Sequence, residues 1–321
     1  MDLFTPVADQ YAAFARQARH DSACFSSWAD QVAADPELCA WIATLPAIKQ
    51  QPNLVFAAAR WHGVPAPGPY DALRTALLED SGPIRATIES RSTQTNEVGR
   101  LAVLTPALAQ LGAEPAALLE VGASAGLCLY PDRYGYDWGG HRLAAPPGAP
   151  TLRCTTSGPT PRPAHLPRLA WRGGLDLNPL DVTDADAMAW LENLVWPEQE
   201  HRRLRLRAAI EIARADPPRL RTGNLLTDLD AAIDEAAAHG PVVVYHCAVV
   251  VYCTPEERAE FSAAMRARVQ SGRCRWISYE GSGVISGLDA TPPHPHHFAL
   301  ALDGRQVAWA HAHGRTLDWL G

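Results

Sequence analysis

Glu120, Gly122 and Gly126 stand in the stretch LLEVGASAGL, where an apolar run ends in an acid and a glycine-rich turn follows. Glycine lets the backbone come close to a ligand, and open α/β folds bind ligands at the carboxyl ends of their strands. The spacing departs from the Gly-x-Gly-x-x-Gly fingerprint of dinucleotide binding, and an acid would repel a nearby phosphate. An acid here suits a ligand with an ammonium group. S-adenosylmethionine, which has an amino-acid end, a ribose and a sulfonium, meets these demands.

Two further residues have side chains suited to acid-base chemistry. His246 lies in the apolar run PVVVYHCAVVV, and Glu280 follows the apolar run WISY. The ordinary pKa of histidine suits a general base that removes a proton from a hydroxyl or amine as a methyl group moves, and Glu280 is the alternative base. A buried, hydrogen-bonded histidine without a catalytic role is the competing interpretation of His246.

The segment QTNEVGR at 94–100 crowds polar groups just before an apolar helical pattern. Capping of that helix explains Thr95 and Glu97. Capping leaves Gln94 and Arg100 unexplained. The helix is followed by a short connector and then by the strand that precedes the glycine turn. The segment therefore also predicts a substrate-binding set, formed by Gln94, Asn96, Glu97 and Arg100.

Short β-rich runs alternate with helical periods from residue 117 onward, which is typical of a parallel sheet with crossover helices. The predicted strands are 117–121, 168–176, 219–222, 242–248, 275–279, 298–302 and 306–310. The predicted helices between them cover 185–196, 198–215, 224–238 and 255–270. Asp303-Gly304 predicts a hairpin that gives the sheet an antiparallel end.

The pattern of the first part of the chain predicts helices instead. Val7, Tyr11, Phe14 and Ala18 recur at helical spacing, residues 54–61 form an apolar helix before Gly63, and 95–111 predict a helix that Pro106 bends or splits. We expect an N-terminal helical cap over residues 1–114 and an α/β domain over 115–321. A hairpin and a Pro-rich insert interrupt that domain at about 132–168.

Composition narrows the class of protein. The 321 residues are 20% charged and 47% hydrophobic, and the net charge is −7. This acidic balance argues against nucleic acid as a partner and favours a small-molecule substrate. The N-terminus lacks the positive region of a signal peptide, the longest apolar run is too short to span a bilayer, and seven cysteines without a CxxC pair indicate reduced thiols. We expect a cytoplasmic protein; the sequence leaves its oligomeric state open.

The histidines near the C-terminus raise the question of a metal. His294, His296 and His297 lie in PPHPHHFAL, and His311 and His313 follow. Their spacing matches no helical ligand motif, and the prolines indicate a loop. We expect no metal site.

The run from 117 to 321, with its glycine turn and terminal hairpin, resembles the nucleotide-binding half of class I S-adenosylmethionine-dependent methyltransferases. That resemblance implies a Rossmann-like seven-stranded sheet. Across the whole chain, four motifs look like the bacterial family of unknown function DUF2332: QTNEVGR at 94–100, EVGASAGL at 120–127, DRYGYDW at 132–138 and RGGLDLNPLDV at 172–182. This closer resemblance names relatives without naming a reaction.

The methyltransferase resemblance implies roles for individual residues. The loop under the methionine part of the cofactor would consist of Glu120, Gly122, Ala123, Ser124 and Gly126. Asp176 resembles the acid that binds both ribose hydroxyls, and Asn224 stands where an acid commonly meets the adenine amino group. His246 would face the transferred methyl. About fifty residues separate the loop from Asp176, so Asp137 is a competing ribose ligand.

Two other classes of function stay open. The run after 242–248 lacks the Asn/Asp-Pro-Pro-aromatic sequence of amino-methylating enzymes, which favours a non-catalytic nucleoside-binding or regulatory protein. A nicotinamide or flavin oxidoreductase is disfavoured by the glycine spacing.

Overall fold

The computed structural model describes residues 5–289, 291–294 and 297–321 and divides into two compact units. The helical unit comprises Met1–Thr95 and Ala185–Leu204, and the sheet unit comprises Asn96–Asp184 and Arg205–Gly321. The predicted boundary at 114 differs from this division. The helix that ends at Leu111 is buried along most of its length, and it lies in the sheet unit.

Several helices make up the helical unit, and aromatic side chains fill its core. Phe56 lies 5.1–6.2 Å, between ring centroids, from the rings of Tyr11, Phe14, Phe25 and Trp28. Local signals start the helices: Ser22 and Asp35 cap two of them, and proline stands at the first turn of others. The helices are α1 (Val7–Ala18), α2 (Ala23–Ala33), α3 (Pro36–Ala43), α4 (Pro52–Trp61), α5 (Tyr70–Leu78), α6 (Pro83–Ser90), α8 (Ala185–Leu194) and the first residues of α9 (Glu200–Ala215), with a 3₁₀ turn at Ala47–Lys49.

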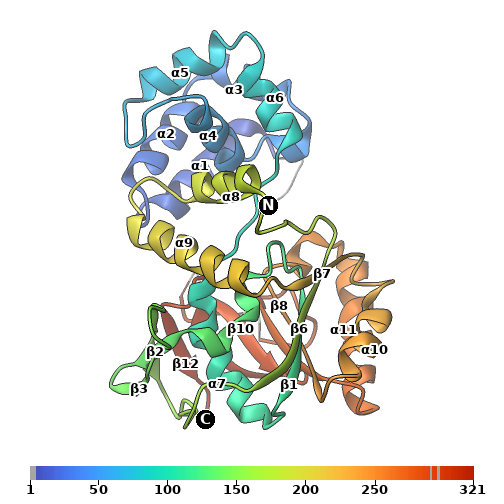
Figure 1. Ribbon diagram of the computed structural model, residues 1–321. Coiled ribbons are helices and arrows are strands. Elements are labelled where there is room, and N and C mark those ends of the chain that lie inside the picture. Colours follow the sequence, from blue (N-terminus) through green and yellow to red (C-terminus); the bar gives the residue numbers. More distant parts are fainter. Residues whose placement is uncertain (1–4, 290, 295–296) are drawn as a thin grey trace. The chain divides into compact units, whose positions relative to one another are not determined.

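The sheet unit contains a mixed, mostly parallel sheet of nine strands in the order β5-β12-β11-β10-β9-β8-β1-β6-β7 (Figure 1). All seven predicted strands are present: β1 (Ala116–Val121), β6 (Leu169–Asp176), β7 (Arg219–Thr222), β8 (Val242–Cys247), β9 (Arg275–Gly281), β10 (His297–Leu302) and β11 (Arg305–His311). Two strands that were not predicted, β5 (Thr155–Ser157) and β12 (Thr316–Trp319), extend one edge. They are only three and four residues long, so the sequence carries little signal for them.

The direction of the strands follows the predicted pattern. β7, β6, β1, β8 and β9 run parallel, and β9, β10, β11 and β12 are antiparallel to one another in turn. The predicted hairpin at Asp303-Gly304 is confirmed, with both residues in left-handed conformations.

Helices cover both faces of the sheet (Figure 1). α10 (Leu229–Ala237) and α11 (Pro255–Gln270) pack on one face, where the core contains Leu119, Val244 and Trp276. α7 (Leu101–Leu111) covers the other and continues through Pro106 without a break. This face receives Leu118 and Tyr245, because successive residues of a strand point to opposite sides.

A small second sheet follows the glycine loop. β2 (Gly135–Trp138) and β3 (His141–Leu143) form the predicted hairpin, and β4 (Thr151–Arg153) from the Pro-rich insert pairs with β2. Between the loop and this sheet the chain forms two 3₁₀ turns, Leu127–Leu129 and Pro131–Arg133, instead of the α-helix expected after a first strand. Pro131 cannot donate the hydrogen bond that a helix through this position would need.

Candidate functional site

The glycine loop, residues 122–126, lies at the carboxyl end of β1. Its neighbours in the sheet are β6 on one side and β8 on the other, so the order of strands along the chain reverses here. In open α/β sheets ligands bind at such a switch point. Gly122, Ser124 and Gly126 have φ of +74°, +52° and +69°. The loop thus has the left-handed backbone that its glycines predict, with one serine under strain.

Asp176, at the end of β6, is tied to this loop. Its carboxylate accepts a hydrogen bond from the backbone N–H of Ser124 at 2.8 Å and another from that of Asn178 at 2.7 Å. The N–H of Leu180 donates to the Ser124 carbonyl at 2.9 Å. Asp176 is partly exposed, and each carboxylate oxygen keeps acceptor capacity beyond its one backbone bond. The predicted ribose ligand therefore lies beside the loop.

The two other candidate nucleoside ligands are engaged elsewhere. Asp137 accepts hydrogen bonds from Gly140 N–H and from Arg142 Nε within the β2–β3 hairpin. Asn224 is exposed, and its side-chain oxygen accepts the N–H of Leu226 at 2.8 Å. Asn224 therefore stabilises the turn before α10.

Asn96 joins the segment 94–100 to the loop. Its side-chain amide donates to Ser124 Oγ at 2.7 Å, and its oxygen accepts the N–H of Ala125 at 3.3 Å. Asn96, a member of the predicted substrate-binding set, is thus hydrogen-bonded to the glycine loop. Gln94 belongs to the helical unit.

Glu97 and Arg100 are buried, and both side chains form hydrogen bonds or ion pairs with other residues of the chain. Glu97 accepts the N–H of Gly99 at 2.9 Å and forms an ion pair of 2.6 Å with Arg205. The Arg100 guanidinium donates to the carbonyls of Ala312 at 2.9 Å and Cys247 at 3.3 Å. Paired and hydrogen-bonded charges are the form in which such groups survive burial. These bonds hold Glu97 and Arg100 within the sheet unit.

Glu120 is 5% exposed and points toward the α7 face of the sheet, in register with Tyr245 of β8. Burial raises the pKa of Glu120 to about 8, while the Tyr245 hydroxyl and the Arg100 guanidinium pull that pKa down. Below pH 8 the carboxyl is therefore mostly neutral, and it offers an O–H donor and acceptor oxygens rather than a full negative charge.

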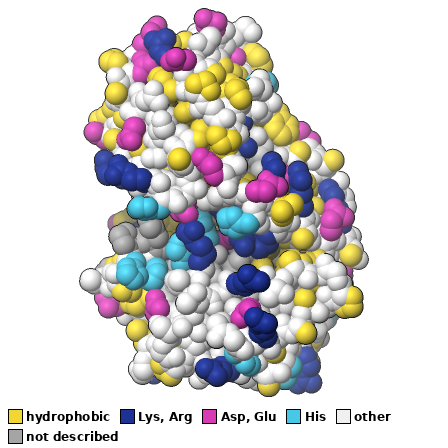
Figure 2. Space-filling view, turned by 90° about the vertical axis from the view of Figure 1, so that its left-hand side faces the viewer, with side chains coloured by type: hydrophobic (Ala, Val, Ile, Leu, Met, Phe, Trp, Pro, Cys, Tyr) yellow, Lys and Arg dark blue, Asp and Glu magenta, His cyan; other side chains and the backbone are white. Residues whose placement is uncertain are grey.

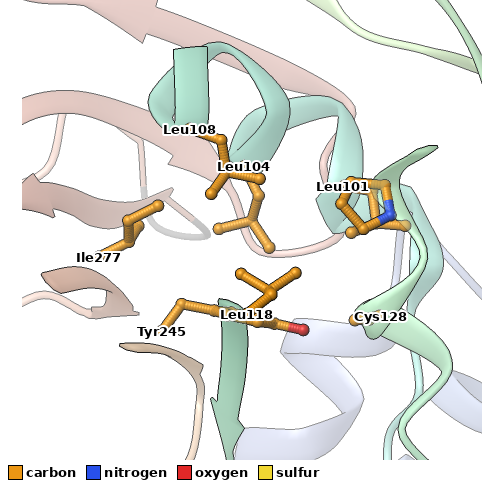
Figure 3. A pocket seen from close by; sticks show the side chains of 8 residues that line it. Leu101, Leu104, Leu108, Leu118, Cys128, Tyr245 and Ile277 are labelled. Carbon is orange, nitrogen blue, oxygen red and sulfur yellow. The ribbon is translucent and has the colours of Figure 1, made fainter. Parts of the chain in front are cut away.

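An apolar gap lies on the same face of the sheet, between α7 and the strands (Figure 3). It is lined mainly by aliphatic side chains, and no water-sized sphere fits inside it. The Tyr245 ring borders it, as do the side chains of Leu104, Leu118 and Ile277 from three different elements. The gap is part of the core and has no room for a substrate.

His246 and Glu280, the two predicted bases, form a pair in the opposite core. His246 Nδ1 and Glu280 Oε1 are 2.7 Å apart, and the indole N–H of Trp276 donates to His246 Nε2 at 3.0 Å. Because Nε2 accepts, Nδ1 carries the proton and donates to Glu280. The two side chains are 0% and 1% exposed. Both ring nitrogens are engaged, which agrees with the buried, structural interpretation of this histidine.

Val249, which the sequence analysis did not single out, lies over the loop. A Cβ added to Gly122 would be 2.4 Å from Val249 Cγ2. The glycine at this position is therefore required by a valine that follows β8. A valine in an apolar run gives no signal for such a contact.

The C-terminal histidines also lie close together. The rings of His294 and His297 are 4.9 Å apart, those of His311 and His313 are 5.5 Å apart, and His297 pairs with His311 across β10 and β11. Figure 2 shows several histidine side chains gathered on one face. Within residues 5–289, 291–294 and 297–321, no group of three or more metal-ligating side chains has a geometry that could hold a metal ion, and His296 lies outside the described residues.

The comparisons with known proteins name a family. The model of a family described as "Uncharacterized protein conserved in bacteria (DUF2332)" matches residues 8–319. The comparison with curated proteins found no match, and neither did the comparison with solved structures. No helix in the described part of the chain has the length and apolar character needed to cross a membrane.

Proposed function

The chain belongs to the DUF2332 family, and from that premise we propose that it binds S-adenosylmethionine at the glycine loop and methylates a small molecule. The observation that carries the proposal is the hydrogen bond between the Ser124 backbone and Asp176. It joins the loop after β1 to the acid after β6, at the switch point of the sheet. A nucleoside whose ribose hydroxyls donate to Asp176 would lie against the loop backbone.

The residues present fit the nucleoside part of this cofactor. Asp176 keeps free acceptor capacity, and carboxylates bind the paired hydroxyls of a ribose through charge-assisted hydrogen bonds. Ala123 and Ser124 supply the backbone under the sugar. Asn96 holds the loop in place from the side.

S-adenosylmethionine, when bound, supplies a sulfonium methyl group that the lone pair of an acceptor attacks in line. The protein's contribution is to hold the acceptor near and aligned with that methyl. His246 and Glu280 are buried and paired with each other, so they do not reach an acceptor. The proposed acceptor therefore carries a nucleophile that needs no protein base, such as a thiolate or a neutral amine.

A second candidate function is favoured by the same buried pair. A protein that binds the nucleoside without transferring a methyl group needs the loop and Asp176 but no base. In this second function the protein still binds the nucleoside but catalyses no methyl transfer. Conversion of the bound cofactor to S-adenosylhomocysteine in the presence of cell extract would exclude it.

Thermal unfolding with S-adenosylmethionine, S-adenosylhomocysteine, NAD(P)H, FAD and ATP in parallel tests the proposal. A ligand at about a hundred times its Kd stabilises the native state by roughly 2.7 kcal/mol, which shifts the midpoint by several degrees. We expect a shift with the two sulfur nucleosides, abolished in Asp176→Ala. A shift with NAD(P)H or FAD alone would replace the proposal by an oxidoreductase, and no shift with any ligand would refute it.

A further inference from the structure

Val249 occupies the space directly over the first glycine of the loop. A Cβ on Gly122 would lie 2.4 Å from Val249 Cγ2, 2.6 Å from its Cβ and 3.2 Å from its Cγ1. Such distances are far inside van der Waals contact, so the side chain rests against the Gly122 backbone. The Val249 side chain is only partly buried and borders the core under α10 and α11.

The Glu280 carboxylate holds Val249 in this position. One oxygen, Oε1, accepts the backbone N–H of Val249 at 3.0 Å and that of Val250 at 3.1 Å, in addition to the bond from His246. The preceding residue, Ala248, has φ of +55°, which a residue with a side chain rarely adopts. Its N–H donates to the Tyr279 carbonyl at 3.2 Å. The buried pair of His246 and Glu280 therefore has a positioning role: it fixes the turn that places Val249 on the loop.

The two ends of the loop have different surroundings. Asp176 reaches the loop at Ser124, and Val249 covers it at Gly122. A nucleoside with its ribose at Asp176 meets polar groups. A group that extends from the sugar toward Gly122 would meet the Val249 side chain, which rests on that glycine.

We propose that Val249 is a specificity-determining residue that selects among sulfur-containing nucleosides by the size of the group on the sulfur. This inference rests on the proposed function, since it assumes that the ribose binds at Asp176. A thioether nucleoside with only a methyl group on sulfur binds without displacing Val249. A nucleoside that carries the full amino-acid chain on sulfur must displace the Val249 side chain, whose backbone Glu280 holds in place. It therefore binds more weakly than it would if residue 249 had a smaller side chain.

Calorimetric titration with 5′-methylthioadenosine and S-adenosylhomocysteine tests this. The two probes share the adenosine and the thioether and differ in the amino-acid part. We expect Val249→Ala to tighten the Kd for S-adenosylhomocysteine at least tenfold and to change that for 5′-methylthioadenosine less than twofold. The matched control is Val251→Ala, in the same turn, whose side chain is partly exposed and is not among the atoms nearest Gly122. We expect it to change neither Kd.

The outcomes separate this inference from the proposed function. If the wild-type protein binds both probes and Val249→Ala shifts both equally or neither, the inference is wrong and the proposed site stands. If no variant binds either probe while thermal unfolding shows each to be folded, the proposed function and the inference fail together. Glu280→Gln is the second variant: its neutral amide oxygen holds the turn less firmly, so we expect a smaller gain for S-adenosylhomocysteine alone.

Discussion

Asp176 and Ser124, 52 residues apart in the sequence, are joined by a hydrogen bond of 2.8 Å from the serine backbone N–H to the aspartate carboxylate. Through this bond the end of β6 fixes the glycine loop that follows β1. The same carboxylate is partly exposed, so it combines a structural bond with capacity for a ligand.

Replacing Asp176 by alanine removes both the hydrogen bond to Ser124 and the acceptor for a ligand. We expect Asp176→Ala to weaken the Kd for S-adenosylhomocysteine at least tenfold, about 1.4 kcal/mol of binding free energy, because the ribose loses its acceptor. Isothermal titration measures this directly. Asp137→Ala is the control, since that carboxylate is bound to Gly140 and Arg142 in the hairpin. Loss of binding in Asp137→Ala with retention in Asp176→Ala would reverse the assignment of the ribose ligand.

The buried carboxyl of Glu120 predicts a pH dependence of stability. Its pKa is about 8 in the folded protein, above the value of 4.5 for an unperturbed glutamate. Between these two values the unfolded state releases the proton and the folded state keeps it, so this group lowers the free energy of unfolding as pH rises, by up to about 1.4 kcal/mol per unit. Below 4.5 and above 8 its contribution is constant.

The variant Glu120→Gln isolates this effect, because its amide has the same shape and no titrating proton. We expect the stability of Glu120→Gln relative to the wild type to increase steadily from pH 5 to pH 8. Denaturant unfolding at several pH values measures the difference. A difference that is independent of pH would show that Glu120 titrates at an ordinary value in the folded chain.

The bonds of His246 predict a structural role for its ring. In His246→Ala, the Trp276 indole N–H loses its acceptor, Glu280 loses one donor, and a cavity opens in the core. We expect a loss of about 2–4 kcal/mol in the free energy of unfolding. His239→Ala, which alters an exposed ring stacked on Trp171, should change it by less than about 0.5 kcal/mol. Undiminished stability in His246→Ala, together with lost methyl transfer, would instead establish a catalytic histidine.

The two bonds of Asn96 to the loop predict that it orders the loop. We expect Asn96→Ala to destabilise the protein by about 1 kcal/mol, to speed hydrogen exchange at the Ala125 amide, and to weaken nucleoside binding several-fold. Thr95→Ala, an exposed neighbour, provides the comparison. Unchanged exchange at Ala125 in Asn96→Ala would mean that the loop keeps its conformation without this side chain.

Local patterns were enough to locate most elements of secondary structure. The apolar runs around Leu119, Val244 and Ile277 predicted three central strands, and Asp303-Gly304 predicted the hairpin, because both signals depend on neighbours in the chain. The glycine loop was predicted for the same reason, whereas the role of Asp176 was an implication of the resemblance to methyltransferases. The short strands β5 and β12 were not, since three or four residues carry little local signal and the pairing of β5 with β12 joins segments far apart in the chain.

The sequence by itself determined which side chains stand at the ends of the strands, and it left their surroundings open. The tertiary structure decided that His246 bonds to Trp276 and Glu280, that Arg100 binds the carbonyls of Ala312 and Cys247, and that Val249 rests on Gly122. Each of these contacts joins residues far apart in the chain. A strand pattern follows from residues a few positions apart, whereas burial, proton placement and steric contact follow from which segments fold against each other. For this reason the hydrogen-bond partners and the burial of the side chains at the strand ends could be assigned only from the tertiary structure.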